Sequence, residues 1–185
     1  MSSQAGSRPG GRSARVQAAV HEAVKALQAE SGRDELTVPA IADRAKVTPS
    51  TIYRRWGDLA SLLADVAVER IRPDGPPADT GTAKGDVHAW AEQYAEESGS
   101  ELGRELLLDI LAARSQVANP ARCCDILRDR LAILTERAET RGEAFPDIDT
   151  VLDTVIAPIV YRTLFDEPPS PEQVHSLVET LWQQR

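Results

Sequence analysis

The stretch Leu36–Trp56, LTVPAIADRAKVTPSTIYRRW, decides the fold of this 185-residue chain. Thr37 can cap a first helix that runs to Ala45. Thr48 can cap a second helix with Pro49 in its first turn, where the missing N–H costs nothing. The small and apolar residues that would hold the two helices together are Ile41, Ala42, Ala45, Val47 and Ile52. Two short helices joined by a tight turn are the layout of a helix-turn-helix, whose second helix enters the major groove of DNA.

The second helix carries side chains that suit a nucleic-acid surface. Hydroxyl groups at its start can bond to bases or phosphates, and arginine pairs bidentately with guanine or phosphate. Arg54 and Arg55 diverge by about 100° around the helix, so we expect one to reach the DNA and the other its backbone or a carboxylate. Trp56 is expected to pack in the core. The candidate DNA contacts are Thr37, Lys46, Thr48, Pro49, Ser50, Thr51, Tyr53, Arg54 and Arg55.

Helices are predicted on both sides of this motif. Residues 12–30 predict an amphipathic helix, and the Gly/Ser-rich residues 1–11 before it predict a flexible arm. Asp58 can cap a further helix at residues 59–72. Residues 73–82, PDGPPADTGT, hold three prolines and two glycines, which predict a linker.

The pattern beyond the linker is helical to the end of the chain. Asn119-Pro120 predicts a helix start, and Ser170 to Gln173 predicts another through a capping box with proline at the first position. The predicted helices lie at residues 83–97, 101–117, 119–141, 147–165 and 170–185. Without a convincing alternating strand, the sequence predicts an all-α fold of about nine helices.

Charge is divided unevenly along the chain. The formal net charge is −8, yet residues 1–72 carry 11 Lys and Arg against 8 Asp and Glu, a net of +3. Residues 73–185 carry 10 against 21, a net of −11. A basic amino-terminal part on an acidic body indicates a division of labour between them. Aromatic residues make up only 4%, which argues against a broad base-stacking surface.

Several functional classes are disfavoured by what the sequence lacks. No apolar run approaches the length of a membrane span, and the first residues do not resemble a secretion signal, so we expect a cytoplasmic protein. Cys123 and Cys124 are neighbours, closer than the usual disulfide spacing, and are expected to be reduced thiols. His21, His88 and His175 lie on separate predicted helices and favour no metal site. Without a phosphate loop or nucleophile elbow, we expect no enzyme, no cofactor and no metal.

The stretch LTVPAIADRAKVTPSTIYRRWGDLASLL resembles the TetR family of bacterial transcriptional regulators. The residues that carry the resemblance are Thr37, Ile41, Ala42, Val47, Tyr53, Trp56, Leu62 and Leu63. Residues 120–182 also look like one group of TetR carboxy-terminal domains. Two positions depart from the family pattern: Lys46 replaces the usual glycine of the turn, and Leu59 replaces a lysine that commonly touches phosphate.

The resemblance implies a domain organisation. It implies a helix-turn-helix DNA-binding domain at residues 12–58, a connecting helix at 59–72, and a helical ligand-binding and dimerisation domain at 83–185. The Trp90 and Tyr94 pair is either core or pocket wall. The candidate pocket residues are Trp90, Tyr94, Leu107, Leu111, Leu127, Leu131 and Tyr161.

The last two predicted helices are joined by the short segment DEPPSP and should form an antiparallel hairpin. Two such hairpins related by a two-fold axis would make a four-helix dimer interface, as the resemblance also implies. The alternative is that their apolar residues only close the core of the monomer. The candidate interface residues are Ile156, Val160, Leu177, Leu181 and Trp182.

Two functional hypotheses follow from these features. The first is a repressor that binds a pseudo-palindromic double-stranded DNA operator as a homodimer and is released by a small-molecule effector. The second is an all-α interaction module whose basic helical hairpin binds an acidic protein partner. The sequence identifies neither the effector nor the operator, and no membrane partner is expected.

Overall fold

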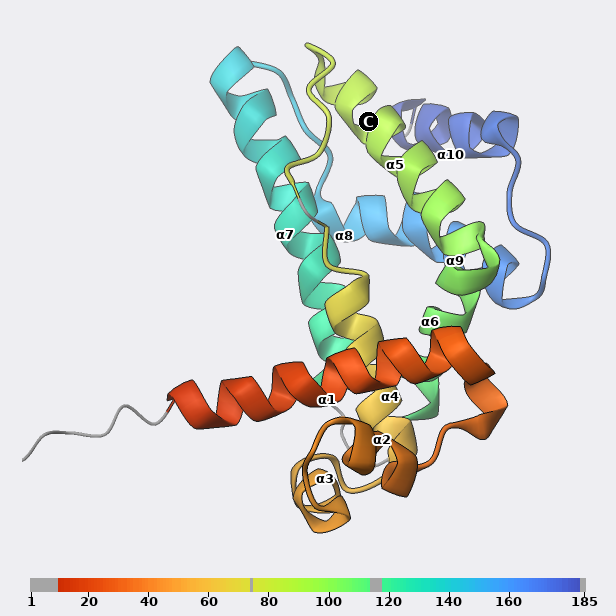
Figure 1. Ribbon diagram of the computed structural model, residues 1–185. Coiled ribbons are helices and arrows are strands. Elements are labelled where there is room, and N and C mark those ends of the chain that lie inside the picture. The colour runs from red at the N-terminus through yellow and green to blue at the C-terminus, as the bar shows by residue number, and fades with distance from the viewer. Residues whose placement is uncertain (1–9, 74, 114–117, 184–185) are drawn as a thin grey trace, which may run out of the picture.

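The computed structural model describes residues 10–73, 75–113 and 118–183, and this part of the chain is helical without any strand (Figure 1). The helices are α1 Gly10–Ser31, η1 Arg33–Glu35, α2 Val38–Arg44, α3 Pro49–Trp56, α4 Leu59–Arg70, α5 Ala83–Gly99, α6 Glu101–Ala112, α7 Ala118–Arg141, α8 Ile148–Val151, η2 Leu152–Ile156, α9 Ala157–Leu164 and α10 Pro171–Gln183. Because α8, η2 and α9 run on without interruption, the described residues form nine main helices. The predicted all-α class is confirmed.

Helices α1 to α4 surround one apolar core. Its largest fully buried side chains include Ile41 of α2, Ile52 and Trp56 of α3, and Leu62 of α4. The predicted Asp58 cap of α4 is confirmed, because its carboxylate accepts the Ser61 backbone N–H at 2.7 Å. The core therefore fixes α2 and α3 against the longer helices that flank them.

Helix α4 belongs to both halves of the molecule. Its first turns pack in the amino-terminal core, while Ala67 and Val68 pack with Leu106 and Ile110 of α6. Figure 1 shows α4 running from the α2–α3 pair up to α6 and α7. A larger core lies beyond, where α5, α7, the α8–η2–α9 helix and α10 meet. A displacement of α4 would therefore change the packing of both cores.

The linker at residues 73–82 is irregular as predicted, but arginines of α7 hold it in place. Arg137 donates to the carbonyl oxygens of Pro77 and Ala78, both at 2.9 Å, and Arg130 donates to that of Gly75. Arg141 pairs with the buried Asp86 at 3.0 Å. The linker is therefore fastened along α7.

Some helix boundaries differ from the sequence-based expectation. The helix expected at residues 147–165 contains the π-helical turn η2, with Ala157 donating to the Leu152 carbonyl. Pro158 explains the widening, because it lacks an N–H and its ring crowds the carbonyl one turn earlier. Helix α6 ends at Ala112, and α7 starts at Ala118, so Asn119 lies inside the helix that it was expected to cap.

The predicted amino-terminal arm, residues 1–11, overlaps the start of α1. Gly10 and Gly11 already belong to α1, and residues 1–9 of the expected arm lie outside the described residues. Residues 114–117, expected to continue the helix of 101–117, lie outside them too. Within the described ranges, no helix has the length and apolar character that crossing a membrane requires.

Candidate nucleic-acid interface and inner cavity

The turn between α2 and α3 has the tight geometry that a helix-turn-helix needs. The Thr37 hydroxyl caps α2 by accepting the Ala40 backbone N–H at 3.3 Å. The Val47 N–H donates to the Ala42 carbonyl at 2.9 Å and closes the turn. Lys46 has a φ of 56°, the left-handed conformation that glycine adopts most easily. Its ammonium group is exposed at the surface, 3.7 Å from the Asp43 carboxylate.

Helix α3 presents hydroxyl groups and charge on one exposed side. The Thr48 hydroxyl lies 2.9 Å from those of both Ser50 and Thr51. Thr48 occupies the N-cap position of α3 as expected. Its side chain makes no capping hydrogen bond to the backbone. Tyr53 is 51% exposed and Arg54 is exposed as well, while Trp56 is buried in the core as expected.

Arg54 and Arg55 point in different directions, as their spacing predicted. Arg55 lies against α1, where it donates to the hydroxyl of Ser13 at 2.7 Å and to the side-chain oxygen of Gln17. Its guanidinium also sits 5.2 Å from the centre of the Trp56 ring, a cation–π distance. Arg55 is therefore a brace between α3 and α1, and Arg54 is the arginine left on the exposed side.

A buried carboxylate joins the helix-turn-helix to the rest of the molecule. Asp65 of α4 accepts hydrogen bonds from Trp56 Nε1 at 2.9 Å and Arg122 Nη1 at 2.7 Å, and lies 3.0 Å from His21 Nε2. Burial alone would raise the pKa of Asp65, but these three hydrogen bonds and the charge of His21 lower it well below its usual range. Asp65 thus connects α1, α3, α4 and α7 as an anion.

The sequence analysis did not predict this cluster. Its members are separated by more than forty residues in most pairs, and for His21 the sequence analysis predicted only that it belongs to no metal site. The one local signal is a single Asp, at position 65, within the otherwise apolar run of α4. A charged residue on the core side of an amphipathic helix is rarely buried without partners, so such a position predicts a paired group.

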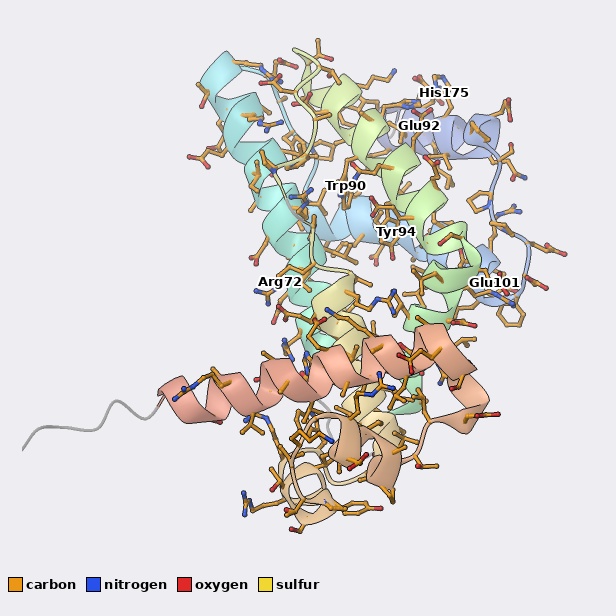
Figure 2. All side chains as sticks on the ribbon, viewed as in Figure 1. Arg72, Trp90, Glu92, Tyr94, Glu101 and His175 are labelled. Atoms are coloured by element: carbon orange, nitrogen blue, oxygen red, sulfur yellow. The ribbon has the colours of Figure 1, made fainter. Side chains whose placement is uncertain are left out.

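An inner cavity of about 280 Å³ lies between α4, α5, α6 and α7. Four of the candidate pocket residues border it: Trp90, Tyr94, Leu107 and Leu127. Figure 2 shows Trp90 and Tyr94 on the side of α5 that faces α7. The wall also includes Arg70 and Ile71 at the carboxyl end of α4. The cavity therefore touches the helix that carries the helix-turn-helix.

Three candidate pocket residues lie elsewhere. Leu111 is 60% exposed and Tyr161 is 64% exposed, and neither borders the inner cavity. Leu131 is fully buried in the core beside α5 and α10. The expectation failed because helical spacing identifies an apolar stripe without showing whether that stripe meets a cavity, the core or solvent.

The expected dimer residues are largely taken up by the chain's own core. Ile156 and Leu181 are buried there, with Val160, Leu177 and Trp182 packed partly buried against it. The reason is that α10 turns back after residue 170 and covers η2 and α5 (Figure 1). The exposed apolar side chains here are instead Tyr161 of α9 and Phe165, which directly follows α9; their ring centres are 4.7 Å apart.

Two histidines that were expected to be unrelated meet at the surface. His88 of α5 contacts His175 of α10, with ring centres 4.4 Å apart. Glu92 lies 3.5 Å from His88, and Glu179 lies 3.6 Å from His175 (Figure 2 labels Glu92 and His175). Across the described ranges, no three His, Cys, Asp or Glu side chains gather as a metal site.

The fold and the exposed α3 define a helix-turn-helix DNA-binding protein with a second helical domain. Comparisons with known proteins identify the group. Residues 22–66 match the model of bacterial regulatory proteins of the TetR family, and residues 77–181 match that of the tetracyclin repressor-like carboxy-terminal domain. The chain belongs to the TetR family of transcriptional regulators, so it is a DNA-binding regulator and not an enzyme.

Individual relatives agree with this assignment. The HTH-type transcriptional regulator YdeS of Bacillus subtilis is 30% identical over 153 residues, which cover 79% of this chain and 77% of that protein. Rv1556 of Mycobacterium tuberculosis, also described as an HTH-type transcriptional regulator, is 27% identical over 159 residues, covering 83% and 79%. The crystal structure of the TetR family regulator SCO0332 is similar with a TM-score of 0.69 at 23% identity, covering 92% and 98% of the two chains.

Proposed function

We propose that this regulator is a ligand-responsive repressor that binds a pseudo-palindromic operator as a homodimer. In this proposal the exposed side of α3 enters the major groove. Pro49, Ser50 and Thr51 lie nearest the base edges, while Tyr53 and Arg54 contact phosphate or guanine. Thr37, at the amino end of α2, and Lys46, in the turn that follows α2, are both exposed and would contact the DNA backbone.

A dimer is needed because one helix-turn-helix offers few contacts. Two copies double the contact set and read two half-sites that lie about 34–36 Å apart or a multiple of that distance. The exposed pair Tyr161 and Phe165, at the carboxyl end of α9, supports an interface at that helix, because large exposed aromatic side chains favour burial against a partner. The interface would therefore be centred on α9 and not on the buried Leu181.

The observation that carries the ligand response is the shared wall of the inner cavity. Arg70 and Ile71 border the cavity, and both lie at the end of α4, whose first turns pack against Trp56. The Asp65–Arg122 hydrogen bond ties the same helix to α7, which supplies another wall. A ligand that favours one position of α4 would shift the population of helix-turn-helix orientations, and with it the half-site spacing.

Selection of bound duplexes from a random pool tests the DNA-binding part of the proposal. We expect enrichment of an inverted repeat, since a two-fold dimer reads the same half-site twice. The variant Arg54→Ala should enrich less of that repeat, and Arg128→Ala, which removes an exposed arginine of α7 paired with Asp149, should enrich it like the parent. A single asymmetric half-site would contradict the dimer. No enrichment, together with binding to an acidic protein, would favour the interaction module.

A further inference from the structure

We propose that the inner cavity binds a compact molecule with a flat apolar body and a carboxylate group. This inference rests on the proposed ligand response and adds the chemical class of the effector. Three features of the cavity carry it: the shape and character of the walls, two buried donors without a partner, and the balance of charge around the opening.

The walls of the cavity suit a flat apolar body. Trp90 and Tyr94 lie one helical turn apart on α5, with ring centres 6.2 Å apart and planes tilted by 32°. Leu106, Ile126 and Leu127 close the space from α6 and α7. A volume of about 280 Å³ lies at the lower end for small-molecule sites, so one or two rings fit better than a long chain.

Two donors that border the cavity have no partner within the protein. Among the residues that the structure describes, the Ser98 hydroxyl and the Arg130 Nε are buried and make no hydrogen bond. Ser98 is only 7% exposed, and both side chains line the cavity. A buried polar group without a partner is costly, so these two groups favour a ligand that brings hydrogen-bond acceptors.

Charge around the cavity favours an anion over a neutral acceptor. Arg70 and Arg130 border it together with one carboxylate, Glu97, which already accepts a hydrogen bond from Gln93 at 2.7 Å. Burial lowers the pKa of Arg130 and the charge of Glu97 raises it, so a further anion in the cavity would favour the charged guanidinium. A carboxylate offers two oxygens for an arginine N–H and a serine hydroxyl, and hydrogen bonds between charged groups are the stronger kind.

Two matched sets of small probes test the inference by isothermal titration of the full-length protein. One set is benzoate, benzamide and benzylamine; the other is 1-naphthoate, 1-naphthamide and 1-naphthylmethylamine. Within each set the ring is constant and only the end group changes. We expect the carboxylate to bind at least tenfold more tightly than the amide, and the amine to bind most weakly. Binding of the same probes should change the tryptophan fluorescence of the parent, because Trp90 borders the cavity.

Variants assign the preference to the two donors. Arg130→Gln should remove most of the tenfold preference for the carboxylate, and Ser98→Ala should weaken carboxylate binding several-fold. The matched control is Arg137→Gln, because Arg137 also fastens the linker but does not border the cavity. This variant should keep the preference of the parent. Circular dichroism and thermal melting of each variant separate loss of a contact from loss of the fold.

The outcomes separate this inference from the proposed function. Tighter binding of the amide or the amine, or unchanged carboxylate affinity in Arg130→Gln, would overturn the inference and leave a ligand-responsive regulator in place. If no member of either set binds, the carboxylate class is wrong. The proposed repressor is contradicted separately, by failure of the duplex selection, which uses no effector.

Discussion

The Arg122 guanidinium of α7 donates to the Asp65 carboxylate of α4 at 2.7 Å and so connects the domain that holds the cavity to the helix-turn-helix. The second oxygen of the same carboxylate accepts from Trp56, a core residue of α3. One buried anion thus lies between the recognition helix and a helix of the cavity wall. A motion that separates α7 from α4 would therefore lengthen the hydrogen bond between Arg122 and Asp65.

Replacing the anion tests how much this connection contributes. Asp65→Asn should lower the free energy of unfolding by about 2 kcal/mol, because the amide keeps the shape but turns donors toward Trp56 or Arg122. Arg122→Gln should cost less, since the Arg122 side chain is 36% exposed and water can replace it. Urea unfolding of both variants and of the double variant gives the coupling free energy between Asp65 and Arg122, which we expect to be about 0.5–1 kcal/mol. Strictly additive effects would contradict a direct connection.

The same residue gives a pH dependence with a defined sign. Since the pKa of Asp65 is lowered in the folded protein, its contribution to stability is present above the unfolded pKa of about 3.9 and is lost as the pH falls toward the folded pKa. The contribution of the Asp65 charge to the stability gap between the parent and Asp65→Asn should therefore be fully present at pH 5. The gap should narrow below about pH 4, as followed by urea unfolding at each pH. A gap that widens as the pH falls below about 4 would contradict the assignment.

Exposed residues of α3 should matter for DNA and not for folding. Tyr53→Phe and Arg54→Ala should each weaken binding on all sequences, and Arg54→Ala should lower the salt slope by about one. Mobility shift at several salt concentrations measures both effects. Arg55→Ala should act differently and lower the melting temperature, because Arg55 braces α3 against Ser13 and Gln17. If both exposed variants bind like the parent, the proposed docking of α3 is wrong.

Substitutions at Lys46 separate the effect of backbone strain at this residue from the effect of its charge. Lys46→Gly should raise the free energy of unfolding by about 1 kcal/mol, because a φ of 56° is unfavourable for a residue with a Cβ. It should also weaken DNA binding by removing a cation. Lys46→Ala is the control, since it removes the same charge without relieving the backbone. Equal stability of the two variants, measured by urea unfolding, would contradict the argument from conformation.

The features that the sequence predicted correctly depend on neighbouring residues. Capping by Thr37 and Asp58, the linker at residues 73–82 and the capping box at Ser170 are set within a few positions of the chain. The divergence of Arg54 and Arg55 likewise follows from helix geometry alone. These features could be predicted because hydrogen bonds and backbone limits over one turn decide them.

The features that escaped prediction depend on packing between distant segments. The stripes of α9 and α10 were recognised, but their apolar residues cover more than one side of each helix, and only the path of α10 shows that Leu181 faces inward and Tyr161 outward. The polar part of the cavity was missed for the same reason. Ser98 and Arg130 look like ordinary surface residues in the sequence, because nothing local indicates that the Ser98 hydroxyl and the Arg130 Nε are buried beside one cavity.

The proposed dimer interface at α9 gives the last prediction. Tyr161 and Phe165 are 64% and 65% exposed, so replacing both with serine removes apolar surface without opening the core of the monomer. We expect Tyr161→Ser with Phe165→Ser to be monomeric by light scattering, with helical content unchanged and operator affinity greatly reduced, because one helix-turn-helix makes half the contacts.

Leu181→Ala is the matched control for this variant. Leu181 is fully packed in the core of the chain itself, so its truncation should lower the free energy of unfolding by about 2–5 kcal/mol, yet leave the folded fraction dimeric. The two variants thus separate the interface from the core. If the serine double variant is still a dimer, the proposed location of the interface at α9 is wrong. A monomeric Leu181→Ala protein with intact helices would instead indicate an interface at α10, because loss of the core would then not explain the dissociation.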